Sequence, residues 1–198
     1  MKDYLKMLKA LIFVFLAAQI VQTVLSHKKK TEEQSQELPH VTTDRLSITP
    51  MCGAELSALI KETDKTDKET ADAYRDMLNG AAENPDKFLW YTAWKITSKE
   101  SGEMIGDLCF KGMPENRQPE IGYGIIEKFR CNGYATEAVY AMCKWALDMQ
   151  NAAAVEAETA PENEASQRVL TKVGFIPTGE SGKEGPRFIL KKNTACEN

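Results

Sequence analysis

The sequence predicts one mixed α/β domain that follows a hydrophobic N-terminal segment. Three observations support this fold class. The chain has 198 residues, which suits one domain of ordinary size with an appendage. Its composition, 42% apolar and 27% charged, is able to bury a core. Finally, segments in which apolar and polar residues alternate, as in strands, are interleaved with segments whose apolar residues follow the 3.6-residue period of helices.

The first half of the domain is expected to hold three strands and two helices. Residues 45–49 (RLSIT) alternate in polarity, which is the pattern of a strand. Residues 88–97 are rich in aromatic and β-branched side chains and precede the turn sequence SKESG, so a hairpin is expected there. Asn79 and Gly80 are expected to end the second helix. The expected strands are 45–49, 88–97 and 103–110, and the expected helices are 52–62 and 68–79.

The second half alternates strands with two further helices. Apolar residues recur at helical spacing from Gly133 to Met149. Gly174 is expected to end the last helix, because glycine readily adopts the left-handed conformation found just after a helix. The expected strands are 120–126, 153–159, 175–178 and 187–191, and the expected helices are 133–149 and 163–173. The predicted order is β-α-α-β-β-β-α-β-α-β-β, without an internal repeat.

An uncharged apolar run extends from Ala10 to Leu25. As a helix it is roughly 24 Å long, which is short for a bilayer core of about 30 Å. Snorkelling of Lys6 and Lys9 would extend the usable span back to Tyr4. Three interpretations stand: a membrane anchor formed by residues 4–25, a secretory signal peptide cut after Ser26, or a helix packed on the domain or on a partner.

The predicted domain boundaries follow from changes in composition. The residues after the apolar run, SHKKKTEEQSQELPH, are polar and lack an apolar period, so they predict a linker. The expected organisation is a hydrophobic N-terminal helix in residues 1–26, a polar linker in 27–40, the globular domain in 41–192 and a C-terminal tail in 193–198.

The net charge of −4 conceals an asymmetry. Residues 1–30 hold six lysines and one acid, so the rest of the chain carries a net charge of −9. An acidic body disfavours nucleic acid as the main partner. It is compatible with a cationic substrate such as an amine, and solubility alone explains it equally well.

Cysteine and histidine usage excludes several kinds of site. The five cysteines are odd in number and none forms a C-x-x-C pair, so neither a disulfide framework nor a zinc site is supported. Both histidines, His27 and His40, lie before the domain. A His-based triad or a metal centre is therefore not expected.

The segment from Arg130 to Thr136 is a candidate phosphate site. It lies between an expected strand and a long helix, whose first-turn N–H groups and dipole favour an anion. Gly133 permits close approach of a ligand, Ala135 is small, and Arg130 can pair a phosphate through two hydrogen bonds. A purely structural alternative is that Asn132 is the N-cap of the helix.

These residues resemble the GNAT superfamily of N-acetyltransferases. The sequence R-C-N-G-Y-A at 130–135 resembles the family's Arg/Gln-x-x-Gly-x-Gly/Ala pyrophosphate loop, and the flanks EIGYGI and ATEAVYAMCKWAL resemble its strand and helix. Downstream, APENEASQRVLTKVGF resembles the P-x-N-x-x-S…GF signature of the branch with ribosomal-protein-alanine N-acetyltransferases. The resemblance spans roughly residues 43–191.

The resemblance implies the GNAT fold, a central mixed sheet with splayed parallel strands flanked by helices, and acetyl-CoA as the co-substrate. The splayed strands would be 120–126 and 153–159. The pyrophosphate would bind the loop of Arg130, Cys131, Asn132, Gly133, Tyr134, Ala135 and Thr136. A backbone N–H near Ile125 or Ile126 would then polarise the thioester carbonyl.

Two residues of the second motif are implied to lie beside the donor. Asn163 would bind pantetheine or backbone, and Ser166 would be the hydroxyl near the CoA sulfur. Many family members carry a tyrosine acid one turn further on, where this chain has Leu170, and this departure favours Ser166. The structural alternative is that Asn163 is a helix N-cap and Ser166 an ordinary first-turn residue.

Glu120 resembles the family's strand carboxylate, which acts as a base through a water. Its alternative is an exposed carboxylate at a strand end. Tyr123 and Tyr91 are expected in the core or as cross-strand partners, with the acceptor side as the second interpretation.

The expected function is transfer of an acetyl group from acetyl-CoA to a primary amine, a protein N-terminus or a small molecule, without a metal. The alternative is a non-catalytic module, tethered to a membrane, that binds acyl-CoA or a peptide. Acetyl-CoA is kept in the cytosol, so we expect an uncleaved anchor with a cytoplasmic catalytic domain. A soluble cytoplasmic protein is the alternative location.

Overall fold

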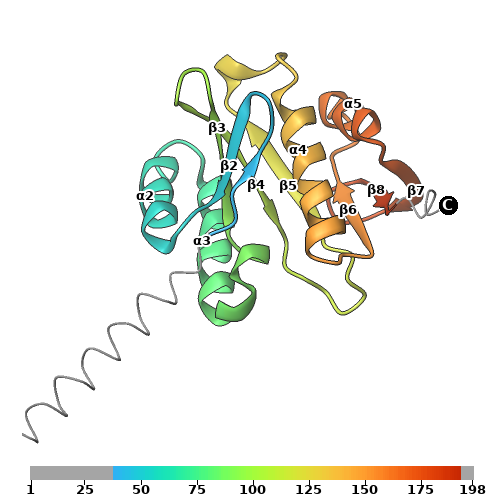
Figure 1. Ribbon diagram of the computed structural model, residues 1–198, viewed down its shortest axis with the longest axis horizontal. Coiled ribbons are helices and arrows are strands. Elements are labelled where there is room, and N and C mark those ends of the chain that lie inside the picture. The colour runs from blue at the N-terminus through green and yellow to red at the C-terminus, as the bar shows by residue number, and fades with distance from the viewer. Residues whose placement is uncertain (1–37, 193–198) are drawn as a thin grey trace, which may run out of the picture. The chain divides into compact units, whose positions relative to one another are not determined.

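The computed structural model describes residues 38–192, which form two β-sheets with helices against them (Figure 1). The strands are β1 (Val41–Thr42), β2 (Leu46–Pro50), β3 (Ala93–Ser98), β4 (Met104–Phe110), β5 (Ile121–Ile125), β6 (Ala154–Glu158), β7 (Ile176–Ser181) and β8 (Pro186–Lys191). The α-helices are α2 (Gly53–Thr63), α3 (Lys68–Glu83), α4 (Tyr134–Lys144) and α5 (Glu164–Val173). Short turns of helix are η1 (Pro85–Trp90), η2 (Glu127–Phe129) and η3 (Trp145–Met149).

The two sheets meet along one pair of parallel strands. Strands β1 to β5 lie in sequence order, each antiparallel to the next, and β6, β8 and β7 form a second antiparallel sheet. A parallel bridge between Glu120 and Glu156 joins β5 to β6. The expected mixed α/β class is confirmed. The expected central mixed sheet is instead two antiparallel sheets, and their parallel contact is the bridge between Glu120 and Glu156.

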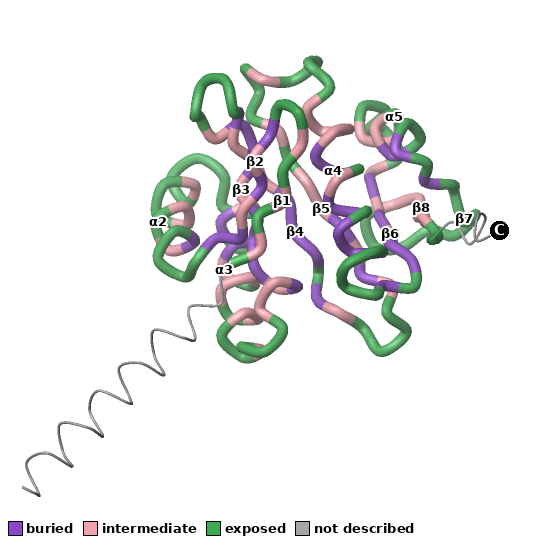
Figure 2. The backbone as a smooth tube through the Cα atoms, in the orientation of Figure 1, coloured by how far each residue is buried: buried purple, intermediate pink, exposed green. Residues whose placement is uncertain are grey.

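Helix α4 packs on one face of the sheets through an aromatic cluster. Trp145, in the π-helical turn that continues α4, lies with its ring centroid 4.8 Å from Trp94 and 5.2 Å from Trp90. Phe110 stacks on Trp145 at 6.0 Å. Each such pair contributes about 0.5–1.5 kcal/mol beyond its buried area. The buried segments in the middle of Figure 2 correspond to this core. The cluster fixes α4, and therefore the position of its first turn.

Helices α2 and α3 pack against a second core cluster. Leu56 of α2 and Tyr74 of α3 contact Met51 and Ala93 there. Gly124 of β5 is exposed, and a side chain at this position would meet open space.

Two expected elements differ from the structure. Helix α3 does not end at Gly80 but runs on to Glu83. Gly80 is needed inside the helix because a Cβ there would lie 2.9 Å from the ring of Tyr91. The strand expected from residue 88 begins only at Ala93, because residues 85–90 form a 3₁₀ helix. Pro85 suits such a turn, since it needs no N–H at its start.

The expected hydrophobic helix, membrane anchor and linker before residue 38 lie outside the described residues. Within residues 38–192, no helix is both long and apolar enough to cross a membrane.

Candidate functional site

The loop before α4 turns through two residues in the left-handed region. Gly133 has φ 79° and Cys131 has φ 64°. Asn132 lies between them, and its side-chain amide donates to the carbonyls of Phe129 (3.2 Å) and Arg130 (2.9 Å). The alternative in which Asn132 caps the helix is therefore wrong. Gly133 is the N-cap, and the Asn132 side chain stabilises the turn instead.

The first turn of α4 is left open for a ligand. No side chain among the described residues caps it, so the N–H groups at Tyr134, Ala135 and Thr136 have no capping acceptor. Gly133 is exposed and has no Cβ to cover these groups. Together with the positive end of the helix dipole, this arrangement makes the helix start a candidate anion site.

Arg130 joins this loop to the end of β5. Its side-chain Nε donates to the carbonyl oxygen of Ile125 at 3.0 Å, and the residue is exposed. The guanidinium is therefore held at the end of β5, where its Nε is bound to the backbone.

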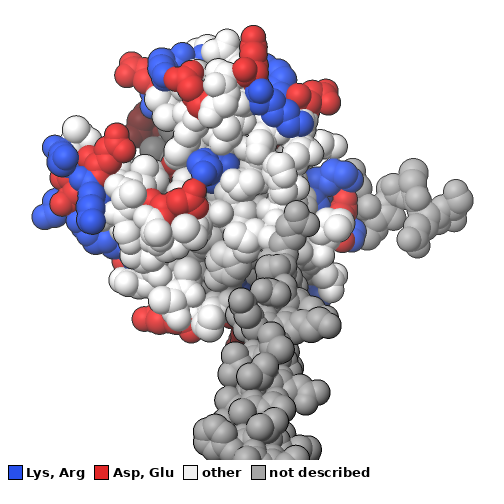
Figure 3. Space-filling model, turned by 60° about the vertical axis from the view of Figure 1, so that its left-hand side comes forward, with Lys and Arg blue, Asp and Glu red and all other residues white. Residues whose placement is uncertain are grey.

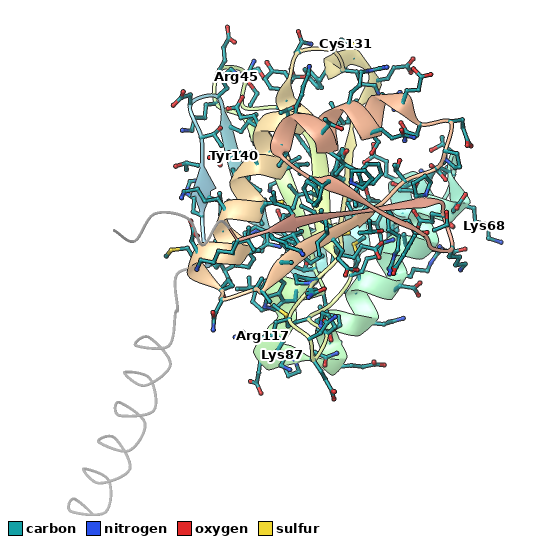
Figure 4. The ribbon with its side chains drawn as sticks, turned by 90° about the vertical axis from the view of Figure 1, so that its right-hand side faces the viewer. Arg45, Lys68, Lys87, Arg117, Cys131 and Tyr140 are labelled. Carbon is teal, nitrogen blue, oxygen red and sulfur yellow. The ribbon has the colours of Figure 1, made fainter. Side chains whose placement is uncertain are left out.

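Strands β5 and β6 are held together at one end only. The N–H of Glu156 donates to the carbonyl of Pro119 (2.9 Å), and that of Ala153 to Arg117 (2.7 Å). Past the Glu120–Glu156 bridge, the ladders of residues 38–192 contain no further pair between the two strands. In Figure 4, Arg117 lies at the opposite end of the molecule from Cys131. The unpaired stretch thus runs towards the candidate anion site.

The backbone N–H groups of Ile125 and Ile126 point to opposite edges of β5. The N–H of Ile126 donates to the carbonyl of Ile105 in β4 at 2.9 Å. Because bonding direction alternates along an antiparallel strand, the N–H groups of Tyr123 and Ile125 point to the other edge, towards β6. Of the two expected donors, only Ile125 directs its N–H to the unpaired stretch.

Asn163 and Ser166 lie at the start of α5. Asn163 is the N-cap, and its side-chain oxygen accepts from the backbone N–H of Ser166 at 3.0 Å. The hydroxyl of Ser166 lies 2.8 Å from the hydroxyl of Tyr123 on β5. The α5 start and β5 are thus joined by two side-chain hydroxyl groups. Leu170, where the family often has its tyrosine acid, is fully buried.

Tyr123 is half-buried against the main core. Burial raises its pKa above the ordinary value of 10.0; the hydrogen bond with Ser166 lowers the pKa and Cys143 raises it. At neutral pH the phenol therefore keeps its proton. The expectation that Tyr123 packs in the core is confirmed, but its hydroxyl also has a polar partner in the second motif.

Glu120 lies at the closed end of the strand pair. One oxygen of its carboxylate is 2.5 Å from Nζ of Lys111, and the other accepts from Nη2 of Arg187 at 3.3 Å. Arg187 also contacts Glu156 (3.7 Å) and Glu158 (3.5 Å). A water that reaches the Glu120 carboxylate has to compete with these cations.

Arg45 is a residue of this region that no sequence pattern indicated. Its side chain binds Glu137 in the first turn of α4 and the carbonyl of Asn132. The contacts span about ninety positions of sequence, so only the fold brings them together. In Figure 4, Arg45 and Cys131 lie at the same end of the molecule.

Charge at the surface is mixed. On the face shown in Figure 3, basic and acidic side chains lie beside one another rather than in separate patches. Within residues 38–192, no cluster of three or more His, Cys, Asp or Glu side chains is placed to hold a metal ion.

The described residues thus combine two antiparallel sheets, joined by one parallel bridge, with an open helix start. The chain belongs to the GNAT acetyltransferase family, because its sequence matches the acetyltransferase (GNAT) domain over residues 39–176.

Curated relatives are N-acetyltransferases of Bacillus. The chain is 33% identical over 94 residues to the uncharacterised N-acetyltransferase YjdG of Bacillus subtilis, a match that covers 47% of this chain and 56% of that protein. It is 32% identical over 87 residues to YoaA of the same organism, covering 43% and 49%. The chain thus spans about half the length of these relatives.

Solved structures share the fold across different acceptors. The ribosomal L7/L12 α-N-protein acetyltransferase RimL has a TM-score of 0.62 at 16% identity, with 80% of this chain and 97% of that one covered. The ribosomal-protein-S5-alanine acetyltransferase of Vibrio fischeri scores 0.61 at 15% identity, with 78% and 96% covered. The spermidine N-acetyltransferase of Vibrio cholerae scores 0.59 at 10% identity, with 75% and 95% covered. At these identities the likeness concerns the fold alone.

Proposed function

We propose that this chain transfers an acetyl group from acetyl-CoA to a primary amine. The observation that carries the proposal is the open first turn of α4 at the end of the unpaired edge of β5, with Arg130 in the loop between them and bound to the carbonyl of Ile125. A ligand with a phosphate group at the helix and an extended arm along the strand edge fits this arrangement.

The residues of the loop fit the diphosphate of CoA. A diphosphate needs several N–H donors that have no acceptor of their own, and the start of α4 supplies them at Tyr134, Ala135 and Thr136. Gly133 leaves the approach clear. The side chain of Arg130 adds a positive charge. Cys131 and Asn132 complete the turn, so the whole segment from 130 to 136 is proposed to hold the donor.

Acetyl-CoA supplies the acetyl group as an activated thioester. The N–H of Ile125 is proposed to donate to the carbonyl oxygen, where negative charge develops during transfer. Asn163 holds the backbone of Ser166 so that the serine hydroxyl faces Tyr123. This hydroxyl pair is proposed to pass a proton to the departing thiolate as the new C–N bond forms.

The acceptor is proposed to be a protein N-terminus or a small-molecule amine. An α-amine with a pKa of about 7.8 is about one-tenth neutral at pH 7, whereas a lysine is almost wholly charged. Glu120 is proposed as the base that acts through a water, and this role matters most for an amine of lysine type. Membrane attachment through residues 4–25 is a separate proposal.

The binding proposal is tested at Gly133. Gly133→Asp and Gly133→Asn add side chains of almost equal size, both tolerated better than most in the left-handed region. Only Asp adds a negative charge where the diphosphate is proposed to lie. We expect calorimetry with acetyl-CoA to show at least about ten-fold weaker binding for Asp than for Asn, the equivalent of about 1.4 kcal/mol. Equal affinities for the two variants would place the diphosphate elsewhere.

A further inference from the structure

Arg45 and its neighbour Thr43 hold one carboxylate of α4. The Nε and Nη2 atoms of Arg45 lie 2.7 Å and 2.6 Å from Oε2 of Glu137. The backbone N–H of Arg45 (3.1 Å) and the hydroxyl of Thr43 (2.5 Å) donate to the other oxygen of that carboxylate. The segment before β2 is thus fixed to the first turn of α4 by four contacts.

The same arginine also orients the peptide group at the helix start. Its Nη1 donates to the carbonyl oxygen of Asn132 at 3.0 Å. In a trans peptide the following N–H points away from the carbonyl. The N–H of Gly133 is therefore directed away from Arg45. Binding a cation to the carbonyl also polarises the peptide and strengthens its N–H as a donor.

The guanidinium remains accessible. It lies 4.6 Å from the ring centroid of Tyr134, and its Nη2 is 3.5 Å from where a Cβ of Gly133 would stand. The Arg45 side chain is 49% exposed. Together with Gly133 and Thr136, it lines a groove of about 1140 Å³. A ligand at the helix start can therefore reach this charge.

Glu137 explains why a cation is needed here. A carboxylate in the first turn of α4 repels any phosphate that binds the same turn. Burial raises the pKa of Glu137, but hydrogen bonds from Thr43 and Arg45 outweigh it and hold the pKa below 4.5, so the carboxylate is ionised at neutral pH. Arg45 compensates that charge through direct contact.

We propose that Arg45 is a positioning residue of the acyl-donor site, which orients the Gly133 peptide and neutralises Glu137 so that the start of α4 accepts a diphosphate. This inference rests on the proposed use of acetyl-CoA. It predicts a defect that is specific to the phosphate-bearing part of the donor.

The test compares two donors on the full chain. Arg45→Met should weaken acetyl-CoA binding by about ten-fold or more in calorimetry, as expected for loss of a charge-assisted contact. Acetyl-pantetheine lacks the diphosphate, so its turnover by Arg45→Met should match that of the parent. Arg45→Met/Glu137→Gln should regain part of the lost affinity for acetyl-CoA, because the uncompensated carboxylate is gone.

Controls separate this role from a structural one. Arg75→Met removes a partly exposed, ion-paired arginine on α3 and should leave acetyl-CoA binding and acetyl-pantetheine turnover unaffected. Arg45→Lys keeps the positive charge but lacks the planar guanidinium that makes two hydrogen bonds at once. Its affinity for acetyl-CoA should lie between those of the parent and of Arg45→Met. The inference would be overturned if Arg45→Met lost acetyl-pantetheine turnover by the same factor as acetyl-CoA affinity, or if its acetyl-CoA affinity were unchanged. A parent chain that does not bind acetyl-CoA would instead refute the proposed function, and this inference with it.

Discussion

At the scale of single residues, the hydroxyl pair of Tyr123 and Ser166 is central to the proposed chemistry. The two oxygens are 2.8 Å apart, and either can be the donor. A bond of this kind lets one hydroxyl release a proton while the other replaces it. Tyr123 is proposed to supply the phenol that the family often places where this chain has Leu170.

Ser166→Ala and Tyr123→Phe should each lower kcat by about a hundred-fold, the lower end of the range for general acids. Acetyl-CoA affinity should change little, since neither hydroxyl is proposed to hold the donor. Because the two act as a unit, the double variant should be no slower than the slower single variant. Steady-state kinetics and calorimetry provide both quantities. Losses that multiply in the double variant would mean that the two hydroxyls act independently.

Several site residues could be predicted from the sequence, and others could not. The loop at Gly133 and the cap at Asn163 are local patterns whose residues are neighbours in the chain. Arg45 escaped notice because its partners Asn132 and Glu137 come from another element. The Tyr123–Ser166 contact spans 43 positions for the same reason. Local patterns indicate which backbone groups are open, whereas tertiary packing decides which side chains meet them.

At the scale of elements, burial within the sheet raises the pKa of a carboxylate on a central strand. Asp107 on β4 accepts a hydrogen bond from the Tyr74 hydroxyl of α3 at 2.7 Å. Burial raises the pKa of Asp107 above the ordinary value of 3.8, and this bond offsets it only in part. The folded protein therefore holds the proton more tightly than the unfolded chain does. The associated stability is present below about pH 4 and is lost as the pH rises through the folded pKa.

Asp107→Asn should accordingly raise the Tm at pH 7 and change it little at pH 3, because the amide oxygen still accepts from Tyr74 without a buried charge. Asp148→Asn is the matched control. Asp148 is exposed and pairs with Lys144, and the hydrogen bond with Lys144 lowers the pKa of Asp148. Replacing this carboxylate should therefore lower the Tm at pH 7. Thermal unfolding at the two pH values measures both. A lower Tm for Asp107→Asn at pH 7 would contradict the assigned cause.

Element boundaries show where sequence patterns suffice. Helix α5 ends at Gly174, as predicted, because a left-handed residue (φ 107°) is required there. Helix α3 continues past Gly80, where the glycine makes room for the ring of Tyr91. A glycine required by tertiary packing thus has the same sequence signature as a glycine that ends a helix. The aromatic residues of 88–90 suggested a strand, but Trp90 instead fills the core beneath α4.

At the scale of the whole molecule, the fold class could be predicted because strand and helix periods follow one another clearly. The separation of the strands into two sheets could not, since pairing partners are not marked in local patterns. The boundaries of the domain, and the anchor in residues 4–25, remain predictions. Solved structures that share this fold are named for ribosomal-protein and spermidine acceptors, so the fold alone does not identify the acceptor.

The most direct test of the proposed function is thiol release from acetyl-CoA by the full chain, with peptide N-termini, lysine peptides, polyamines and amino sugars as acceptors. We predict release that depends on one class of amine, matched mole for mole by acetylated amine in mass spectrometry and at least ten-fold slower in Ser166→Ala. Saturating acetyl-CoA at a hundred times Kd should also stabilise the protein by about 2.7 kcal/mol. Stabilisation without thiol release from any amine would contradict the transferase and favour an acyl-CoA-binding module.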